Sequence, residues 1–188
     1  SRYGKWRPFQ LAFVLMNLKS MAKRNCSDRS IVDLIWFPTG GGKTEAYLGL
    51  SAYTIFIRRI KDKSNAGTAI LMRYTLRLLT SQQYERAAAM ICACDVIRKE
   101  FEDKLGKDRI SIGLWVGDAT TPNTMKKAVD AYKKIYRDGS VSENSPIVIL
   151  KCPWCGAQMG VVRTGKTYKI PGYKKAPDGR KEKVILQR

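Results

Sequence analysis

Short apolar runs and longer periodic stretches alternate along the chain, and this alternation predicts strands and helices in turn. The run 31–37 is short, apolar and rich in β-branched residues, which is typical of a buried strand in a parallel sheet. The predicted strands lie at 31–37, 68–73, 109–116 and 146–150. The predicted helices lie at 11–21, 45–59, 76–104 and 123–137. This order predicts a doubly wound α/β fold with a parallel sheet.

A glycine-rich turn joins the first predicted strand to the helix that follows it. Its sequence is Phe37-Pro38-Thr39-Gly40-Gly41-Gly42-Lys43-Thr44. Successive glycines let backbone N–H groups surround phosphate oxygens, and the positive end of the helix that starts at Lys43 adds to the attraction. The lysine can reach the β- and γ-phosphates, and the hydroxyl of Thr44 can bind Mg²⁺. The alternative is a connector without a ligand, which the flanking strand and helix make the weaker interpretation.

The charge of the chain indicates a polyanionic partner. The 188 residues include 35 Lys and Arg against 16 Asp and Glu and no histidine, which gives a net charge of +19. Nucleic acid is the first choice of partner and an acidic membrane surface the second, although part of the excess is ordinary solvated helix surface. No apolar run is long enough to span a membrane, and the start of the chain has no signal-peptide core. Five cysteines, an odd count, favour a reducing compartment such as the cytoplasm.

Polar and basic residues follow the second predicted strand, in the stretch from Met72 to Gln83. Ligands of open parallel sheets gather at the carboxyl ends of the strands, so this stretch is a candidate nucleic-acid contact. Thr75 is equally typical of a helix N-cap, and the two interpretations are compatible because a helix N-terminus binds phosphate. The helix at 123–137 has a basic flank that is either solvated or in contact with a nucleic-acid backbone. That flank consists of Lys126, Lys127, Lys133 and Lys134.

The sequence Cys152-Pro153-Trp154-Cys155-Gly156 has the spacing of a zinc knuckle, in which a turn brings two thiolates to one metal. Tetrahedral zinc needs four ligands, and no Cys or His follows Cys155 in the sequence. The pair is therefore half of a Zn²⁺ site, or a reduced thiol pair without metal. The following residues, 151–188, combine short β runs with Gly, Pro and Lys, which predicts a small basic β-rich insertion.

Several of these segments resemble motifs of superfamily 2 helicases. The glycine-rich turn resembles motif I, although Phe37 stands where P-loops in general have Gly. The sequence Arg7-Pro8-Phe9-Gln10 resembles the Q motif, in which the glutamine amide binds adenine, a base that it can both donate to and accept from. The alternative for Gln10 is a surface polar residue early in a helix. The stretch 72–83 resembles motif Ia, which holds one nucleic-acid strand by its phosphates.

Together with Gly-Leu-Trp-Val-Gly at 113–117 and the cysteine pair, these motifs resemble the large phage-defence helicases of the bacterial DISARM system, the DrmA type. The resemblance covers most of residues 6–156 and implies a DNA-dependent ATPase with a RecA-like P-loop NTPase lobe. It implies a first, partial lobe at 1–150 and a partial zinc-ribbon-like insertion at 151–188. It also implies ATP and Mg²⁺ as ligands, DNA as substrate and a DrmB-type partner protein.

The residues that the resemblance and the motifs indicate fall into three groups. The nucleotide-binding residues are Phe9, Gln10, Pro38, Thr39, Gly40, Gly41, Gly42, Lys43, Thr44 and Glu45, with Lys43 and Thr44 as catalytic residues and Thr44 as the Mg²⁺ ligand. The nucleic-acid-binding residues are Arg73, Thr75, Arg77, Gln82 and Gly117. The zinc ligands are Cys152 and Cys155.

One motif of these helicases is missing. They need an Asp-Glu pair that holds Mg²⁺ and orients the attacking water, and no Asp-Glu dipeptide occurs in the chain. We therefore expect an N-terminal part of a larger helicase or translocase, with the pair and the second lobe elsewhere. The alternatives are a non-catalytic nucleic-acid-binding module that retains a P-loop and another P-loop enzyme such as a nucleotide kinase.

Overall fold

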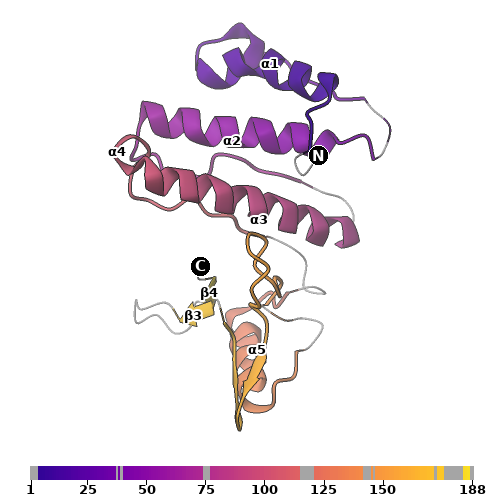
Figure 1. Cartoon of the computed structure of the whole chain (residues 1–188), viewed down its shortest axis with the longest axis vertical. Coiled ribbons are helices and arrows are strands. Elements are labelled where there is room, and N and C mark those ends of the chain that lie inside the picture. The colour runs from indigo at the N-terminus through magenta and orange to yellow at the C-terminus, as the bar shows by residue number, and fades with distance from the viewer. Residues whose placement is uncertain are drawn as a thin grey trace. The chain divides into compact units, whose positions relative to one another are not determined.

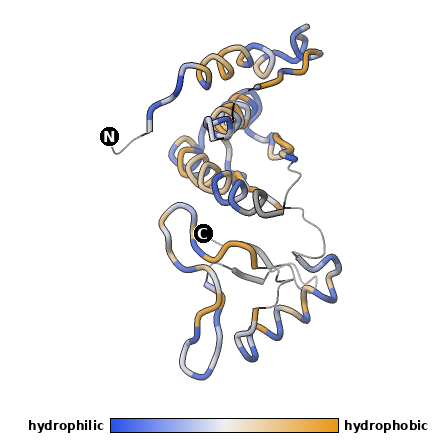
Figure 2. The backbone as a smooth tube through the Cα atoms, turned by 90° about the vertical axis from the view of Figure 1, so that its right-hand side faces the viewer, coloured by the Kyte–Doolittle hydropathy of each residue, from blue (hydrophilic) through white to orange (hydrophobic). Residues whose placement is uncertain are grey.

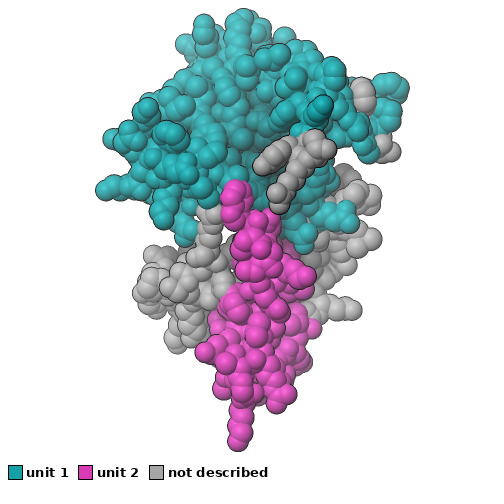
Figure 3. Space-filling model, in the orientation of Figure 1, with its two compact units in different colours: residues 1–112 teal, residues 113–188 magenta. Residues whose placement is uncertain are grey.

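The structure is a computed structural model that forms two compact units, residues 1–112 and residues 113–188 (Figure 3). The described residues are 4–36, 38, 40–73, 77–114, 121–141, 145, 147–171, 173–175 and 184–186, of which 77–81, 173–175 and 184–186 are described by their backbone alone.

Helices make up the regular structure in the described residues of the first unit. They are α1 (Pro8–Ala22), the short 3-10 helix η1 (Ser27–Ser30), α2 (Lys43–Lys61), α3 (Arg77–Glu100) and α4 (Glu102–Leu105). In Figure 1, α2 lies between α1 and α3, in agreement with the contacts that α2 makes with both. Apolar and polar residues alternate every few positions along these helices (Figure 2). In α1 the fully buried residues are polar, namely Gln10, Asn17 and Ser20, whereas Leu15 and Met16 are 65% and 70% exposed.

Helix α1 is fixed along the length of α2. The rings of Phe13 and Tyr47 meet edge to face, with centroids 5.9 Å apart and planes at 86°. The Tyr53 hydroxyl donates to the carbonyl oxygen of Leu18 at 3.3 Å. At the far end, the Lys61 ammonium donates to the carbonyl oxygen of Ala22. These contacts hold α1 against α2 from Phe13 to the C-terminal end of α1.

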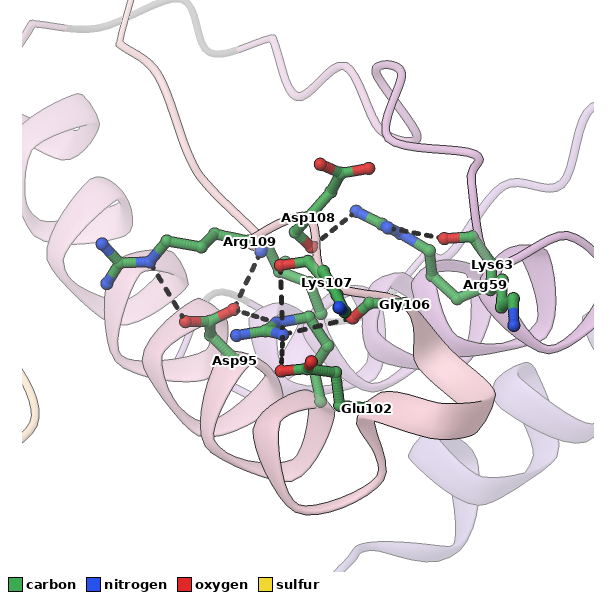
Figure 4. A network of polar contacts seen from close by, with 10 residues as sticks. Arg59, Lys63, Asp95, Glu102, Gly106, Lys107, Asp108 and Arg109 are labelled. Carbon is green, nitrogen blue, oxygen red and sulfur yellow. Dashed lines mark hydrogen bonds and ion pairs between the residues drawn. The ribbon is translucent and has the colours of Figure 1, made fainter.

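A buried polar network lies near the C-terminal end of α3, where the chain turns back (Figure 4). The guanidinium of Arg98, 5% exposed, bonds Asp95 at 2.6 Å and donates to the carbonyl oxygen of Gly106 at 3.2 Å. Asp95 also accepts from the backbone N–H of Ile110 at 2.9 Å. Burial raises the pKa of Asp95, but the hydrogen bonds from Arg98 and Ile110 outweigh it, so the pKa is lowered overall.

A second buried arginine joins α2 to the same turn. Arg59, 4% exposed, donates to the carbonyl oxygens of Lys63 and Asp108, each at 3.1 Å. Gly106, with φ of +82°, lies so close to Lys63 that an added Cβ would come within 2.1 Å of its carbonyl oxygen. The two arginines therefore satisfy backbone carbonyls that the tight turn at 106–108 would otherwise bury without partners.

In its described residues, the second unit contains one helix and two antiparallel pairs of short strands. Its elements are α5 (Met125–Asp138), β1 (Val162–Thr164), β2 (Thr167–Lys169), β3 (Tyr173–Lys175) and β4 (Val184–Leu186). β1 pairs with β2 and β3 with β4, both antiparallel. α5 packs on β2, and Ile135, Ile147 and Ile170 form the buried core. Gly139 ends α5 at φ +72° directly under the ring of Tyr168, where an added Cβ would meet a ring atom at 2.3 Å.

The predicted parallel α/β sheet is wrong. Within the described residues, the sheets are two-stranded and antiparallel, and none is parallel. The predicted strands at 31–37, 68–73, 109–116 and 146–150 belong to no sheet where the structure describes them. Val32 and Leu34 are 93% and 86% exposed, and Leu71 is 83% exposed. A RecA-like lobe is therefore not supported, because its strands would pair with one another and bury these side chains.

The predicted helices are confirmed within a few residues at their ends, with one difference. The helix predicted at 76–104 is two helices, α3 and α4, separated at Phe101, whose φ and ψ of −117° and 43° are not helical. The predicted β runs near 161–162 and 184–186 correspond to β1 and β4. The domain division at 150 stays a prediction. Among the described residues, no helix is long and apolar enough to cross a membrane.

Candidate nucleotide-binding site

The glycine-rich turn before α2 contains the strongest functional motif of the sequence. Gly40 and Gly42 have φ of +76° and +89°, values that residues with a Cβ rarely adopt. The N–H of Gly41 donates to the carbonyl oxygen of Pro38 at 3.2 Å, which closes the turn. Helix α2 begins directly afterwards at Lys43. The turn therefore directly precedes the N-terminus of α2, whose first-turn N–H groups have no acceptor within the helix.

The surroundings of Gly42 and Gly40 show how closely other atoms approach the backbone of the turn. A Cβ added to Gly42 would meet the Gln10 side-chain nitrogen at 2.7 Å and a Glu45 carboxylate oxygen at 3.3 Å. A Cβ added to Gly40 would meet nothing within 4 Å. Gly42 is thus needed for close packing as well as for its backbone angle, whereas Gly40 has open space beside it. Open space beside a helix N-terminus suits a phosphate group.

Gln10 links α1 to this turn. Its side chain is buried, at 4% exposed. Its Oε1 accepts from the backbone N–H of Arg7 at 2.7 Å, and its Nε2 donates to the carbonyl oxygen of Gly42 at 2.7 Å. Gln10 is thus a buried residue with both amide atoms bonded to the protein. Its predicted role in adenine binding stays a prediction.

Arg7 adds a second link that the sequence motifs did not single out. Its guanidinium donates to the carbonyl oxygen of Gly41 at 2.8 Å. Trp6, next to it, lies directly on α2, because a Cβ added to Gly49 would meet a ring atom of Trp6 at 2.7 Å. The signal in the sequence was weak: a glycine inside a predicted helix often marks a close approach, here by an aromatic ring. Arg7 and Gln10 together hold consecutive carbonyls of the turn.

The predicted catalytic residues begin α2. The Lys43 ammonium donates to the carbonyl oxygen of Pro38 at 3.2 Å, so the side chain folds back over the turn. Thr44 lies in the first turn of α2, half-buried. Glu45 forms an ion pair with Arg86 of α3, and its other carboxylate oxygen is buried without a hydrogen-bond partner. Phe9 is half-buried on α1, Pro38 is exposed, and Phe37 and Thr39 lie outside the described residues.

The predicted nucleic-acid-binding residues are only partly described. Arg73 and Gln82 are exposed, and Arg77 begins α3, where the structure describes the backbone alone. Thr75 and Gly117 lie outside the described residues. The structure thus brings the nucleotide-binding candidates of α1, the turn and α2 together, and it leaves Arg73 and Gln82 accessible.

The two predicted zinc ligands lie on a tight hairpin. The N–H of Cys152 donates to the carbonyl oxygen of Ala157 at 2.7 Å, and the N–H of Gly156 donates to that of Cys152 at 2.8 Å. A bridge between Lys151 and Gln158 continues the hairpin, and Gly156 has φ of +73°. Cys152 is half-buried and Cys155 exposed. A turn of this kind with two soft thiol donors fits one edge of a zinc site, but no third ligand joins them among the described residues.

Comparison with known proteins finds a bacterial relative. The chain is 43% identical, over 162 residues, to "DISARM protein DrmA" of Bacillus paralicheniformis. The alignment covers 82% of this chain and 14% of that protein, so the chain spans a small part of its relative's length. The resemblance to the DrmA type is thereby confirmed. No protein-family profile and no solved structure matches the chain.

Proposed function

We propose that the chain supplies the nucleotide-binding part of a DNA-acting ATPase in a bacterial anti-phage defence protein. The observation that carries the proposal is the glycine-rich turn, which opens a helix of 19 residues and is held by Arg7 and Gln10 through consecutive carbonyl oxygens. A turn with two positive-φ glycines in front of a long helix suits a triphosphate. The similarity to DrmA supports the setting in phage defence.

Within this proposal, each residue of the turn has one role. The first-turn N–H groups of α2 bind phosphate oxygens, and Lys43 leaves the Pro38 carbonyl to contact the transferred phosphate. Thr44 provides a hydroxyl ligand for Mg²⁺. Hydrolysis transfers the γ-phosphoryl group to water, and the carboxylates that orient this water come from another part of the protein. The chain alone therefore binds ATP weakly and hydrolyses it negligibly.

DNA is the proposed second ligand. Arg73, Arg77 and Gln82 follow one another where the chain enters α3, and Arg73 and Gln82 are exposed. The net charge of +19 favours a polyanion. Binding through phosphates is independent of sequence and strongly salt-dependent. In a DISARM setting, a DrmB-type protein is the proposed partner.

The experiment that tests this function replaces Lys43 by Ala in the natural full-length protein. Loss of a charged hydrogen bond to phosphate is worth about 1.5–3 kcal/mol, so nucleotide binding should weaken roughly ten- to hundred-fold and DNA-stimulated turnover should disappear. The control is Lys99→Ala, which removes the same charge from the exposed surface of α3. Unchanged binding of a fluorescent ATP analogue by the Lys43 variant would falsify the assignment of the turn.

A further inference from the structure

Four lysines share one side of α5. Lys126, Lys127, Lys133 and Lys134 are all exposed, and we call them the α5 lysine face. Ile135, which is 1% exposed, packs with Ile147 and Ile170 in the core of this unit. At 3.6 residues per turn, the four lysines occupy roughly a third of the helix circumference, on the side turned away from Ile135. The helix thus has a buried apolar side and a cationic outer side.

One carboxylate, Asp130, lies among the four lysines of the α5 lysine face, three or four residues from each of them, so the net charge of this face is +3. Among the described residues, none of its lysines lies within ion-pair distance of a carboxylate, since the ion pair of α5 is Arg137 with Asp138 at 3.1 Å. The acidic residues in the described part of this unit are Asp130 and Asp138. The β1–β2 hairpin, which packs on α5, carries further exposed cations. These are Arg163, Lys166 and Lys169.

An aromatic side chain borders this charge. Tyr136 is 40% exposed and follows Lys133 by three residues, so the two side chains are neighbours on the helix surface. The rings of Tyr132 and Tyr136 have centroids 4.7 Å apart, and their hydroxyls share a hydrogen bond of 3.0 Å, which fixes the orientation of Tyr136. A fixed aromatic ring next to a row of cations is the combination on which single-stranded nucleic acids stack their bases.

We propose that the α5 lysine face and Tyr136 bind single-stranded nucleic acid, with phosphates on the lysines and a base on the Tyr136 ring. A basic amphipathic helix can also lie on an anionic membrane, but it then inserts its apolar side. In α5 that side is already buried in the protein core, which favours the nucleic acid. This surface is built from other residues than the candidate nucleotide site, and the proposal rests on the proposed function only for the choice of DNA as the nucleic acid.

The test measures the affinity of the whole protein for a labelled oligo-dT strand between 50 and 200 mM salt, with an oligo-rU strand, duplex DNA and anionic vesicles as further ligands. One variant replaces the four lysines of the α5 lysine face by Gln, which keeps a good helix former at each position. The matched control replaces four exposed lysines of the other unit by Gln. These are Lys23, Lys99, Lys104 and Lys107.

The expected result follows from counterion release, which contributes about 0.7 to the logarithmic salt slope per phosphate contact on a single strand. The α5 variant should lower the slope by between about 1.4 and about 2.8, for two to four contacts, and the control should change it far less. Equal slopes in both variants overturn the proposal. So does vesicle binding that the α5 variant loses while it keeps its affinity for DNA.

Tyr136 gives an independent readout that does not depend on charge. Tyr136→Leu should weaken strand binding about five-fold or more with an unchanged salt slope, whereas Tyr136→Phe should keep the affinity because its ring remains. If duplex DNA binds more tightly than the strand, or if Tyr136→Leu has no effect, bases do not stack there and the proposal fails. Binding of the ATP analogue should be unchanged in all these variants. A failure of this proposal can therefore be distinguished from a failure of the proposed nucleotide site, which the Lys43 variant tests.

Discussion

Gln10 and Gly42, 32 residues apart in the sequence, are joined by a hydrogen bond of 2.7 Å from the glutamine amide to the glycine carbonyl oxygen. The other amide atom accepts from Arg7, so the side chain has no remaining choice of orientation: one end must accept and the other must donate. This fixed polarity makes Gln10 sensitive to substitutions that keep its size but change its donors.

Gln10→Glu is expected to destabilise the protein at neutral pH by about 1–3 kcal/mol, because a carboxylate oxygen then faces the Gly42 carbonyl and two buried acceptors lack a donor. Protonation supplies the missing donor. The folded-state pKa of the new carboxyl is therefore raised above its unfolded value near 4.3, so the variant should regain stability as the pH falls toward 4. Urea denaturation at several pH values measures this. A variant that stays equally destabilised at low pH contradicts the hydrogen-bond assignment.

Asp95 should give the opposite pH dependence. Burial raises the pKa of Asp95, but the hydrogen bonds from Arg98 and the Ile110 N–H lower it by more. The folded-state pKa therefore lies below the unfolded value of about 3.9. The stabilisation is then complete above about pH 4 and is lost as the pH falls through the folded-state pKa. Wild type should lose more stability than Asp95→Asn between pH 5 and 2, a window set by reference pKa values. Parallel stability curves for the two proteins would rule out this role.

Gly106→Ala should be among the most destabilising single changes in the first unit. The new Cβ would lie 2.1 Å from the Lys63 carbonyl oxygen, in a backbone conformation with φ of +82°. With ψ of 167°, Gly106 lies in a backbone region that is essentially restricted to glycine, so the conformational strain alone costs about 1–3 kcal/mol. The displaced backbone would also disturb the carbonyl that Arg98 bonds. Gly165→Ala is the control, because φ there is +62° and nothing lies within 4 Å. A similar loss of stability in both variants would mean that strain, and not the contact with Lys63, decides the cost.

Local pattern predicted the helices well and the sheet poorly, for a physical reason. Helix α2 needs only its own periodicity and the glycine before Lys43, and the sequence located it within two residues at each end. The segment 31–36 has the apolar, β-branched composition of a strand, but a strand also needs partners far away in the chain. Among the residues that the structure describes, this segment has no strand partner, and Trp36 is 89% exposed.

The candidate site was predicted as a set of residues but not as a set of contacts. The motif resemblance selected Gln10 and Gly42 separately, and the bond between them depends on how α1 packs on α2. The role of Arg7 at the Gly41 carbonyl was missed because arginine in an exposed N-terminal stretch is common and carries no local signal. The network around Arg98 was missed for a similar reason, since its acceptors are backbone carbonyls of a turn rather than side chains.

The remaining prediction concerns zinc. We propose that Cys152 and Cys155 provide two of four zinc ligands, because their hairpin holds both thiols on one short turn and tetrahedral zinc prefers thiolates. The other two ligands would come from another cysteine pair of the full-length protein, and a site with four protein ligands would be structural rather than catalytic.

Elemental analysis of the natural full-length protein, purified without chelators, is expected to give about one zinc per chain. Cys152→Ser and Cys155→Ser should each lose the metal, because serine is a poor ligand for it at neutral pH. Cys26→Ser is the matched control, since Cys26 is half-buried beside η1 and outside the hairpin. Zinc binding also depends on deprotonated thiols, so acid should release the metal. The two cysteines of the hairpin should then become reactive towards thiol reagents. Absence of zinc from the freshly purified wild type, or its retention after Cys152→Ser, would exclude the site.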